Sequence, residues 1–319
     1  MKKTLISLAA FILGLCAPLM SAHALTISPA RLEINGDPGQ TISGEFLLTN
    51  EQEGTRTFYS SSENFEAQGE TGTPAFVPGN DGLASWISVV SQVTLKKGQM
   101  QKVPFTIQIP KDADPGGHFA AVFLSTAPSN AKSDQVSIGA KVGVLILLRV
   151  SGDIKEGGGI IGFGTTDKGI LYSTLPISFS YRFSNTGNDR SRPDGSIVIR
   201  DTIGLQAANI AANQTDGNVL PGSTRRFDVS WGTDAPLAAG AGFFEYAGYQ
   251  WSHFAFGWYG ATLNLTYGTA STASAHATVF VFPWQLLIII LVVLVVILFI
   301  LSKGLKSYNR WIISKARGL

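Results

Sequence analysis

Residues 102–109 read KVPFTIQI, a stretch in which apolar side chains occupy every second position from Val103 onward. This period of two is typical of a β-strand that turns one face toward a core. The turn sequence LKKG at residues 95–98 precedes the stretch, and the loop sequence PKDADPGG at residues 110–117 follows it. Together they predict a short strand between two connections, as in a β-sandwich.

The same features recur along the chain on both sides of this strand. Further strands are expected at residues 41–49, 118–125, 140–150, 177–183, 196–201, 224–231 and 261–267. A glycine-rich joint at residues 152–164 (GDIKEGGGIIGFG) separates the earlier strands from the later ones. We therefore expect an all-β fold of two tandem Ig-like β-sandwich domains, at residues 25–152 and 153–270, with one C-terminal transmembrane α-helix.

The C-terminal region has the composition of a membrane anchor. Residues 279–301 contain no charged side chain, and residues 286–301 consist only of Leu, Ile, Val and Phe. A helix of this length crosses the roughly 30 Å hydrocarbon core of a bilayer. We expect this transmembrane helix at residues 280–301, after a linker of small residues at 271–279.

Basic side chains follow the apolar stretch and predict its orientation. The tail at residues 302–319 is basic and contains no acidic residue. By the positive-inside rule the tail is cytoplasmic, which makes the chain a single-pass cell-membrane protein with its N-terminus outside. A short amphipathic helix on the inner leaflet is an alternative for the tail. The residues expected at the membrane interface are Trp284, Lys303, Lys306 and Arg310.

Residues 1–24 have the pattern of a secretory signal peptide. A basic start, MKK, precedes an apolar stretch, and Ala22 and Ala24 form a cleavage site of the A-x-A type. The alternative is a second anchor that is not cleaved. Cys16 is the only cysteine of the chain and lies in this segment, so the exported part has no disulfide and no thiolate metal site.

Charge and motif content point away from nucleic-acid binding and catalysis. All 22 acidic residues lie between Glu33 and Glu245, so the ectodomain has more acidic than basic side chains. It therefore lacks the basic surface that nucleic-acid binding requires. The match of residues 157–162 to G-x-G-x-x-G lacks a strand and helix around it and indicates a linker. Asp112 and Asp114 precede Pro-Gly and indicate a turn rather than a calcium site. We expect no enzyme activity, no catalytic or metal-binding residue and no cofactor.

Residues 242–260 (GFFEYAGYQWSHFAFGWYG) are dense in aromatic side chains. Phe254, Phe256 and Trp258 alternate ahead of the strand at 261–267, which favours the core of the last hairpin of the second sandwich. An aromatic rim that rests on lipid headgroups beside the anchor is the alternative. The earlier aromatic residues are the candidate partner surface, namely Phe243, Phe244, Tyr246, Tyr249 and Trp251.

Several short motifs occur in an order that resembles a known family. They are LTISPA at 25–30, PGQ at 38–40, FLLTN at 46–50, WI at 86–87, PFTIQIPKDADPGG at 104–117, HFAAVF at 118–123 and VLILLRVSG at 144–152. This order resembles the N-terminal, peptidoglycan-binding domain of the WxL-interacting proteins of bacterial cell surfaces. The second half of the chain resembles the companion Ig-like domain of those proteins.

The resemblance implies a cell-surface binding protein. Its first domain would engage the cell wall (peptidoglycan), and its second would bind a surface protein or hold the first away from the membrane. A structural or assembly subunit that pairs with the edge strands of protein partners is the alternative from another class. The expected partners are therefore peptidoglycan or a cell-surface protein, together with the lipid bilayer and without nucleic acid.

Overall fold

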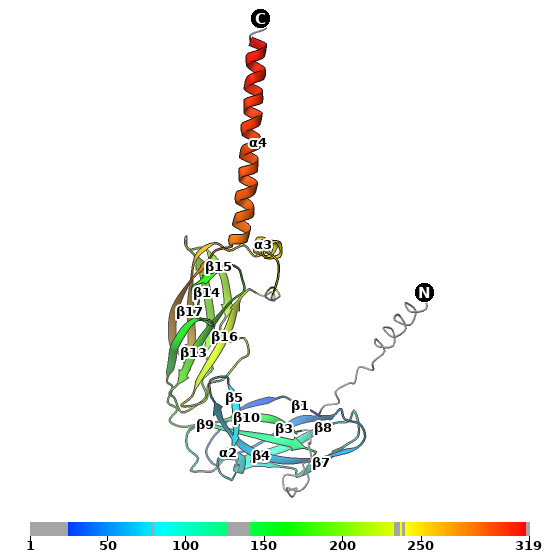
Figure 1. The fold of residues 1–319 in the computed structure, drawn as a ribbon. Coiled ribbons are helices and arrows are strands. Elements are labelled where there is room, and N and C mark those ends of the chain that lie inside the picture. Colours follow the sequence, from blue (N-terminus) through cyan, green and yellow to red (C-terminus); the bar gives the residue numbers. More distant parts are fainter. Residues whose placement is uncertain (1–24, 78–79, 127–140, 233–236, 238–239, 317–319) are drawn as a thin grey trace, which may run out of the picture. The chain divides into compact units, whose positions relative to one another are not determined.

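The computed structural model describes residues 25–77, 80–126, 141–232, 237 and 240–316. The predicted cleavage residues Ala22 and Ala24 lie outside this part of the chain. Figure 1 traces the strands and the long C-terminal helix. Contacts between residues divide the chain into two compact units, Met1–Phe65 with Phe76–Gly152 and Glu66–Ala75 with Asp153–Leu319.

The first sandwich consists of two sheets, and its residues belong to the first unit except for Glu66–Ala75 of β4, β5 and the turn between them. One sheet has the strand order β1-β3-β8-β6, and the other has the order β2-β10-β9-β4-β5 with β7 paired to β4. Strands β2 and β10 run parallel to each other. The elements are β1 (Leu25–Ser28), β2 (Arg31–Gly36), β3 (Thr41–Asn50), β4 (Arg56–Gln68), β5 (Thr73–Val77), α2 (Gly82–Trp86), β6 (Ile87–Val89), β7 (Gln92–Leu95), β8 (Met100–Gln108), β9 (Gly116–Ser125) and β10 (Lys141–Val150).

The strand predicted at residues 102–109 is β8, and its alternation puts one face in the core. Val103, Phe105 and Ile107 are all buried. Beside them on β3, the ring of Phe46 stacks against the ring of Phe105 with 6.2 Å between centroids. Burying side chains of this size contributes roughly 1.5–3 kcal/mol each, which is how a sandwich without disulfides is stabilised.

The second unit contains a further sandwich and two helices. Its three-stranded sheet has the order β11-β13-β16, and its five-stranded sheet has the order β12-β18-β17-β14-β15. The elements are β11 (Gly158–Thr165), β12 (Leu171–Tyr172), β13 (Ile177–Asn185), β14 (Asp194–Asp201), β15 (Gln206–Ala211), β16 (Thr224–Trp231), α3 (Phe243–Ser252), β17 (Gly257–Tyr267), β18 (Ser271–Val281) and α4 (Trp284–Ala316).

Strand β13 supplies the centre of this second core. Ile177, Phe179, Tyr181 and Phe183 lie on one face and are almost fully buried, as their alternation predicts. The hydroxyl of Tyr181 donates a hydrogen bond to the carbonyl oxygen of Ala212 at 3.2 Å, and burial raises the pKa of this tyrosine. The fold class of two Ig-like sandwiches and one C-terminal apolar helix is therefore confirmed.

A buried asparagine ends the long strand β3 of the first sandwich. The side-chain amide of Asn50 donates to the carbonyl oxygens of Gly54 at 3.1 Å and Leu95 at 3.0 Å. Its side-chain oxygen accepts the backbone N–H of Gln52 at 3.0 Å. One buried side chain thus closes its own turn and ties that turn to the end of β7, which belongs to the other sheet.

The second sandwich repeats this arrangement at the end of β13. The side-chain amide of Asn185 donates to the carbonyl oxygens of Asp189 and Val219, both at 2.8 Å. Its side-chain oxygen accepts the backbone N–H of Gly187 at 2.9 Å. The sequence offsets of the two turn contacts, two and four residues, are the same as at Asn50. We call the two arrangements the asparagine corners.

The structure corrects the expected linker and the expected start of the membrane helix. Residues 271–279 lie in strand β18, which pairs along its whole length with β17. Val279 and Val281 are fully buried in the core of the sandwich. The small residues of STASAHA conceal this strand, because they provide almost no apolar alternation. Residues 280 and 281, predicted to begin the transmembrane helix, also belong to β18.

Replacing Asn185 with alanine is expected to lower the free energy of unfolding by about 2–4 kcal/mol, because several buried backbone groups lose their partner. Urea unfolding of the full chain in detergent, followed by tryptophan fluorescence, measures the change. Asn209→Ala is the matched control, because Asn209 is exposed on β15. Equal unfolding midpoints for the two variants would contradict the role given to the corner.

Candidate binding surfaces

Strand β18 leads directly into the long helix α4. Phe282 and Pro283 are the connection, and the N–H of Phe282 donates to the carbonyl oxygen of Tyr172 at 2.7 Å. A proline at the start of a helix sacrifices no helical hydrogen bond, because the first N–H groups have no partner within the helix. The sandwich is therefore joined to α4 without a flexible spacer.

A buried pair of glutamines fixes α3 against the start of α4. The side-chain amide of Gln250 donates to the side-chain oxygen of Gln285 at 2.5 Å and to the carbonyl oxygen of Ser173 at 3.0 Å. The side-chain oxygen of Gln250 accepts the N–H of Leu286 at 3.0 Å, which satisfies one of the unpaired N–H groups in the first turn of α4. Gln250 is only 1% exposed and Gln285 6%.

Helix α4 is long and apolar enough to cross a membrane over Trp284–Ile313. Its uncharged part, residues 284–302, is about 28 Å long at 1.5 Å per residue. That length matches the hydrocarbon core of a bilayer. Trp284 stands at one end of it, and Lys303, Lys306 and Arg310 follow the other end. The helix is thus shifted from the predicted 280–301, and most of the predicted tail continues it as far as Ala316.

The aromatic-rich segment forms a helix where the last hairpin was expected. Residues 243–252 are α3, whose start is closed by a hydrogen bond from the N–H of Gly242 to the carboxylate of Glu245 at 2.8 Å. Phe244 and Trp251 are exposed, Phe243 is at the limit of exposure, and Tyr246 and Tyr249 are half-buried. The structure thus brings all of the candidate partner residues onto one short helix.

The core position expected for Phe254, Phe256 and Trp258 is wrong. All three side chains are exposed, while Ala255 and Tyr259 between and after them are buried. The alternation is present, but the opposite face of the segment packs on the core. The alternation alone does not tell which face of the segment points inward, because aromatic and small residues both suit a buried position.

Ring contacts connect these exposed aromatic residues to the start of α4. The ring of Trp258 lies 5.0 Å from that of Phe280, and Phe256 lies 6.2 Å from Phe282. On α3, the ring of Phe243 lies 5.8 Å from that of Trp284. Aromatic side chains from α3, from the ends of β17 and β18 and from the residues next to those ends therefore contact one another in pairs near the start of α4.

A hydrogen-bonded loop lies at the same end of the sandwich, between β11 and β12. Asp167 accepts hydrogen bonds from the hydroxyl of Tyr172 and from the N–H of Gly169, and these bonds lower the pKa of Asp167. The N–H of Phe280 donates to the carbonyl oxygen of Ile170 at 2.7 Å, which ties the loop to β18. The loop is thus ordered by polar contacts although it displays apolar side chains.

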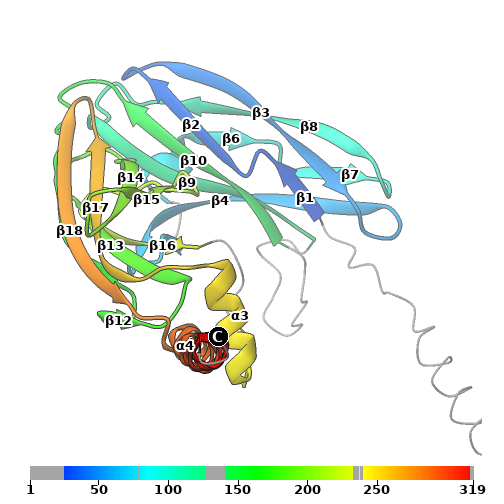
Figure 2. The same ribbon diagram turned by 90° about the horizontal axis from the view of Figure 1, so that it is seen from above.

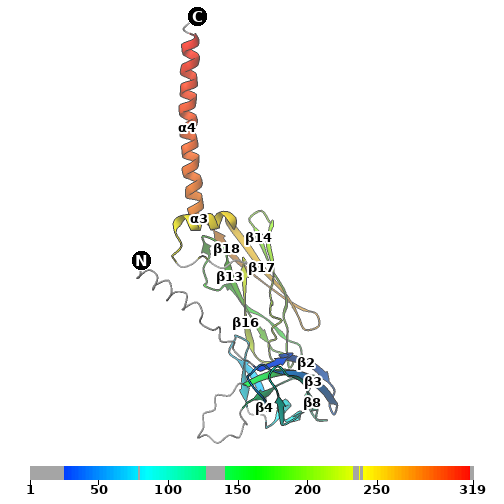
Figure 3. The same cartoon turned by 90° about the vertical axis from the view of Figure 1, so that its right-hand side faces the viewer.

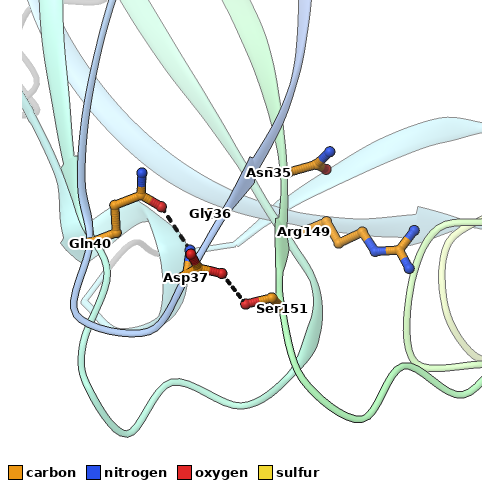
Figure 4. Close-up of a pocket in the computed structure, with 6 residues that line it drawn as sticks. All are labelled: Asn35, Gly36, Asp37, Gln40, Arg149 and Ser151. Carbon is orange, nitrogen blue, oxygen red and sulfur yellow. Dashed lines mark hydrogen bonds between the residues drawn. The ribbon is translucent and has the colours of Figure 1, made fainter.

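The first sandwich has a polar hollow of about 400 Å³, shown in Figure 4. Ser151 donates a hydrogen bond to Asp37, and the N–H of Asp37 donates to the side-chain oxygen of Gln40 at 2.8 Å. These contacts hold the turn after β2 beside the end of β10. The hollow is lined by Asn35, Gly36, Asp37, Gln40, Arg149 and Ser151.

Arg149 supplies the cationic side chain of this hollow. It is paired across the sheet with Asn35 of β2 and with Gly117 of β9. Gly117 has no side chain, so the residue of β9 paired with Arg149 adds none at this position of the sheet. Figure 4 shows the side chains of Asn35 and Arg149 extending in the same direction. A guanidinium suits carboxylates, and the amides beside it suit hydroxyl groups.

Within the described part of the chain, no group of three His, Cys, Asp or Glu side chains is arranged to hold a metal ion. Asp112 lies in the turn that was expected there. The G-x-G-x-x-G match at 157–162 falls largely in strand β11, so a dinucleotide-binding loop does not form.

No protein-family model matches the chain, and no curated protein matches it in sequence. Among solved structures it is similar to the class 5 fimbriae chaperone CfaA, with 13% identity, a TM-score of 0.38, and coverage of 80% of this chain and 98% of that chain. It is also similar to the Acinetobacter baumannii CsuC–CsuE chaperone–tip adhesion subunit complex, with 11% identity, a TM-score of 0.37, and coverage of 80% and 98%. The E. coli chaperone DraB shows 11% identity, a TM-score of 0.33, and coverage of 80% and 98%. At this level of similarity nothing follows about the ligand of this chain.

Replacing Gln250 with alanine is expected to loosen α3 from α4, because the N–H of Leu286 and the side chain of Gln285 each lose a buried partner at about 1–3 kcal/mol. Hydrogen exchange of the full chain in nanodiscs measures this as faster exchange of the α3 amides. Gln206→Ala is the matched control, because Gln206 is exposed on β15. If the Gln250 variant leaves α3 as protected as the control does, the glutamine pair does not hold the helix.

Proposed function

We propose that this chain is a single-pass cell-membrane protein that binds peptidoglycan or a wall-associated surface protein through its first sandwich. The polar hollow around Arg149 is the observation that carries the proposal. It combines one guanidinium, two side-chain amides, a carboxylate and a hydroxyl in one place. Glycan strands offer hydroxyl groups and stem peptides offer carboxylates, and this set of side chains can bind both.

Two further observations support a role at the cell surface. Lys303, Lys306 and Arg310 follow the uncharged part of α4, which by the positive-inside rule makes the end of the chain cytoplasmic and exposes both sandwiches outside. The order of motifs in residues 25–152 resembles the peptidoglycan-binding domain of the WxL-interacting proteins. On this proposal the second sandwich is the stalk that connects the binding domain to the anchor.

Replacing Arg149 with alanine is expected to weaken binding to purified sacculi about tenfold or more, because a hydrogen bond to a charged group contributes roughly 1.5–3 kcal/mol. Co-sedimentation of the full chain, held in nanodiscs, with purified sacculi measures the affinity. Arg149→Lys separates charge from geometry, since a lysine cannot make the two parallel hydrogen bonds of a guanidinium.

Arg200→Ala is the matched control for this experiment. Arg200 is an exposed arginine on β14 of the second sandwich, and its removal leaves the first sandwich untouched. If the unaltered chain fails to sediment with sacculi, binding to the wall is wrong. If it sediments and the Arg149 and Arg200 variants bind equally well, the hollow is not the binding site.

One edge of the second sandwich favours a second candidate function, assembly with a protein by strand pairing. In the described sheet β15 pairs with β14 alone, and its sequence QAANIA contains neither a charged residue nor a proline. Natural edge strands are usually protected by such residues, because an open edge pairs with other chains. An unprotected edge therefore suits the addition of a partner strand.

Replacing Ala207 with proline is expected to leave the fold intact and to abolish pairing at this edge. Ala207 has no partner in the register between β14 and β15, where a bulge occurs, and proline is tolerated at bulges. Crosslinking in intact cells, with Ala207→Thr as the control that keeps the N–H, measures partner recovery. Equal recovery with both variants would rule out assembly through β15.

A further inference from the structure

We propose that the end of the second sandwich where α4 begins lies in the headgroup region of the bilayer and contacts the lipids around α4. Three separate segments make this contact. They are Ile170 with Leu171, Ile203 with Leu205, and Phe244 with Trp251, and we call the six side chains the collar. The inference rests on the proposed membrane crossing of α4 and adds a second, peripheral contact to it.

All six collar side chains are exposed. Their exposed fractions run from 61% for Ile170 to 80% for Ile203. Single exposed apolar residues are common, but apolar residues gathered at one end of a domain mark an interaction surface. This surface is therefore expected to be covered in the working protein.

Hydrogen bonds place the loop of Ile203 and Leu205 at the same end as α4. The hydroxyl of Thr202 donates to the carbonyl oxygen of Trp258 at 3.1 Å, and Trp258 is paired with Phe280 near the end of β18. The carboxylate of Asp201 accepts the N–H groups of Ile203 at 3.0 Å and Leu205 at 2.8 Å. The turn is thus fixed in a form that keeps both apolar side chains outside the core.

The loop before β12 is held at this end as well. Leu171 is paired with Phe280 in the sheet, and the contacts of Asp167 order the residues ahead of it. Ile170 and Leu171 therefore project from a fixed backbone on the side of β18 opposite to β17. In the order of the sheet, one apolar loop therefore lies on each side of β18, near the residue where α4 begins.

Helix α3 completes the collar because it lies across the base of α4. Where α4 is seen end-on, α3 is seen lengthwise beside it (Figure 2), and the same crossing is visible from the side (Figure 3). Phe244 and Trp251 are seven residues apart and so share one face of α3. A helix that lies perpendicular to a membrane span lies in the plane of the membrane, which is the position of interfacial amphipathic helices.

Lipid is the occupant that fits this surface, because the collar is continuous with a helix that itself contacts lipid. Tryptophan is favoured at the level of the headgroups, because its ring is apolar and its N–H is polar. Phenylalanine and leucine occur with it on the apolar face of helices that lie in the interface. The charged side chains within three residues of the collar in sequence are Asp167, Lys168, Arg200, Asp201 and Glu245. Asp167, Asp201 and Glu245 each accept backbone N–H groups, and Lys168 suits lipid phosphates.

Nitroxide labels on the full chain in nanodiscs of phosphatidylcholine and phosphatidylglycerol test the collar. Cys16 is first replaced by serine, and single cysteines are introduced as Leu171→Cys, Leu205→Cys or Phe244→Cys. Power saturation compares the accessibility of each label to oxygen, which enriches in lipid, and to a water-soluble nickel chelate. We expect the depth parameter to be positive at all three positions.

Two further labels make the outcomes distinguishable. Val293→Cys reports the middle of α4, and Thr272→Cys reports the opposite end of β18, about 30 Å away along the strand. A positive value at 293 with negative values at all three collar positions and at 272 overturns the collar and leaves the anchor in place. A negative value at 293 overturns the anchor and the collar together. Dipolar broadening between collar labels on separate chains would show that a second copy covers the collar, which also overturns the contact with lipid.

Discussion

The buried amides of Asn50 and Asn185 impose the constraint on which both sandwiches depend. Each buried amide must be satisfied without water, and its own turn together with a second, distant segment of the chain offers it two carbonyl oxygens and an N–H. A shift of one residue in strand pairing would leave these groups unpaired in the core and would turn every apolar side chain outward. The asparagines therefore select the register, while the apolar faces supply the stabilisation.

The fixed register of the second sandwich carries through to the membrane anchor. Strand β18 is paired from end to end, and its last buried residue, Val281, is followed after two residues by the first residue of α4. Gln250 then ties the start of α4 to α3 and to Ser173. Because of this rigid attachment, the sandwich sets the direction of α4. Any contact between the base of the sandwich and lipid is then made by the loops of the collar.

Alternation in the sequence was enough to predict the strands with large inward side chains, such as β8 and β13. It failed at β18, because Ala and Ser on both faces leave no contrast between inside and outside, and at α3, where aromatic residues suited a hairpin equally well. The start signal of α3, which is Gly242 with Glu245 three residues on, was not considered in predicting this segment. The aromatic residues named as a candidate partner surface fall together on α3, and their role in binding a partner stays a prediction. Their neighbours Leu171 and Leu205 could not be found, because only the strand pairing brings those loops to one end.

Polar and apolar surfaces are segregated between the two sandwiches in a way that fits their proposed neighbours. The hollow of the first sandwich is lined by polar side chains, which are stable in water and can hydrogen-bond a ligand. The collar of the second sandwich consists of apolar side chains, whose free energy falls when they leave water. Asp201 accepts the N–H groups of Ile203 and Leu205, and Asp167 accepts the N–H of Gly169 and the hydroxyl of Tyr172 on either side of Ile170 and Leu171. The apolar loops are therefore held without a core of their own. A stalk built only to space one domain from a membrane would need polar loops at its base. Apolar loops held rigidly there are instead a reason to regard the second sandwich as part of the anchor.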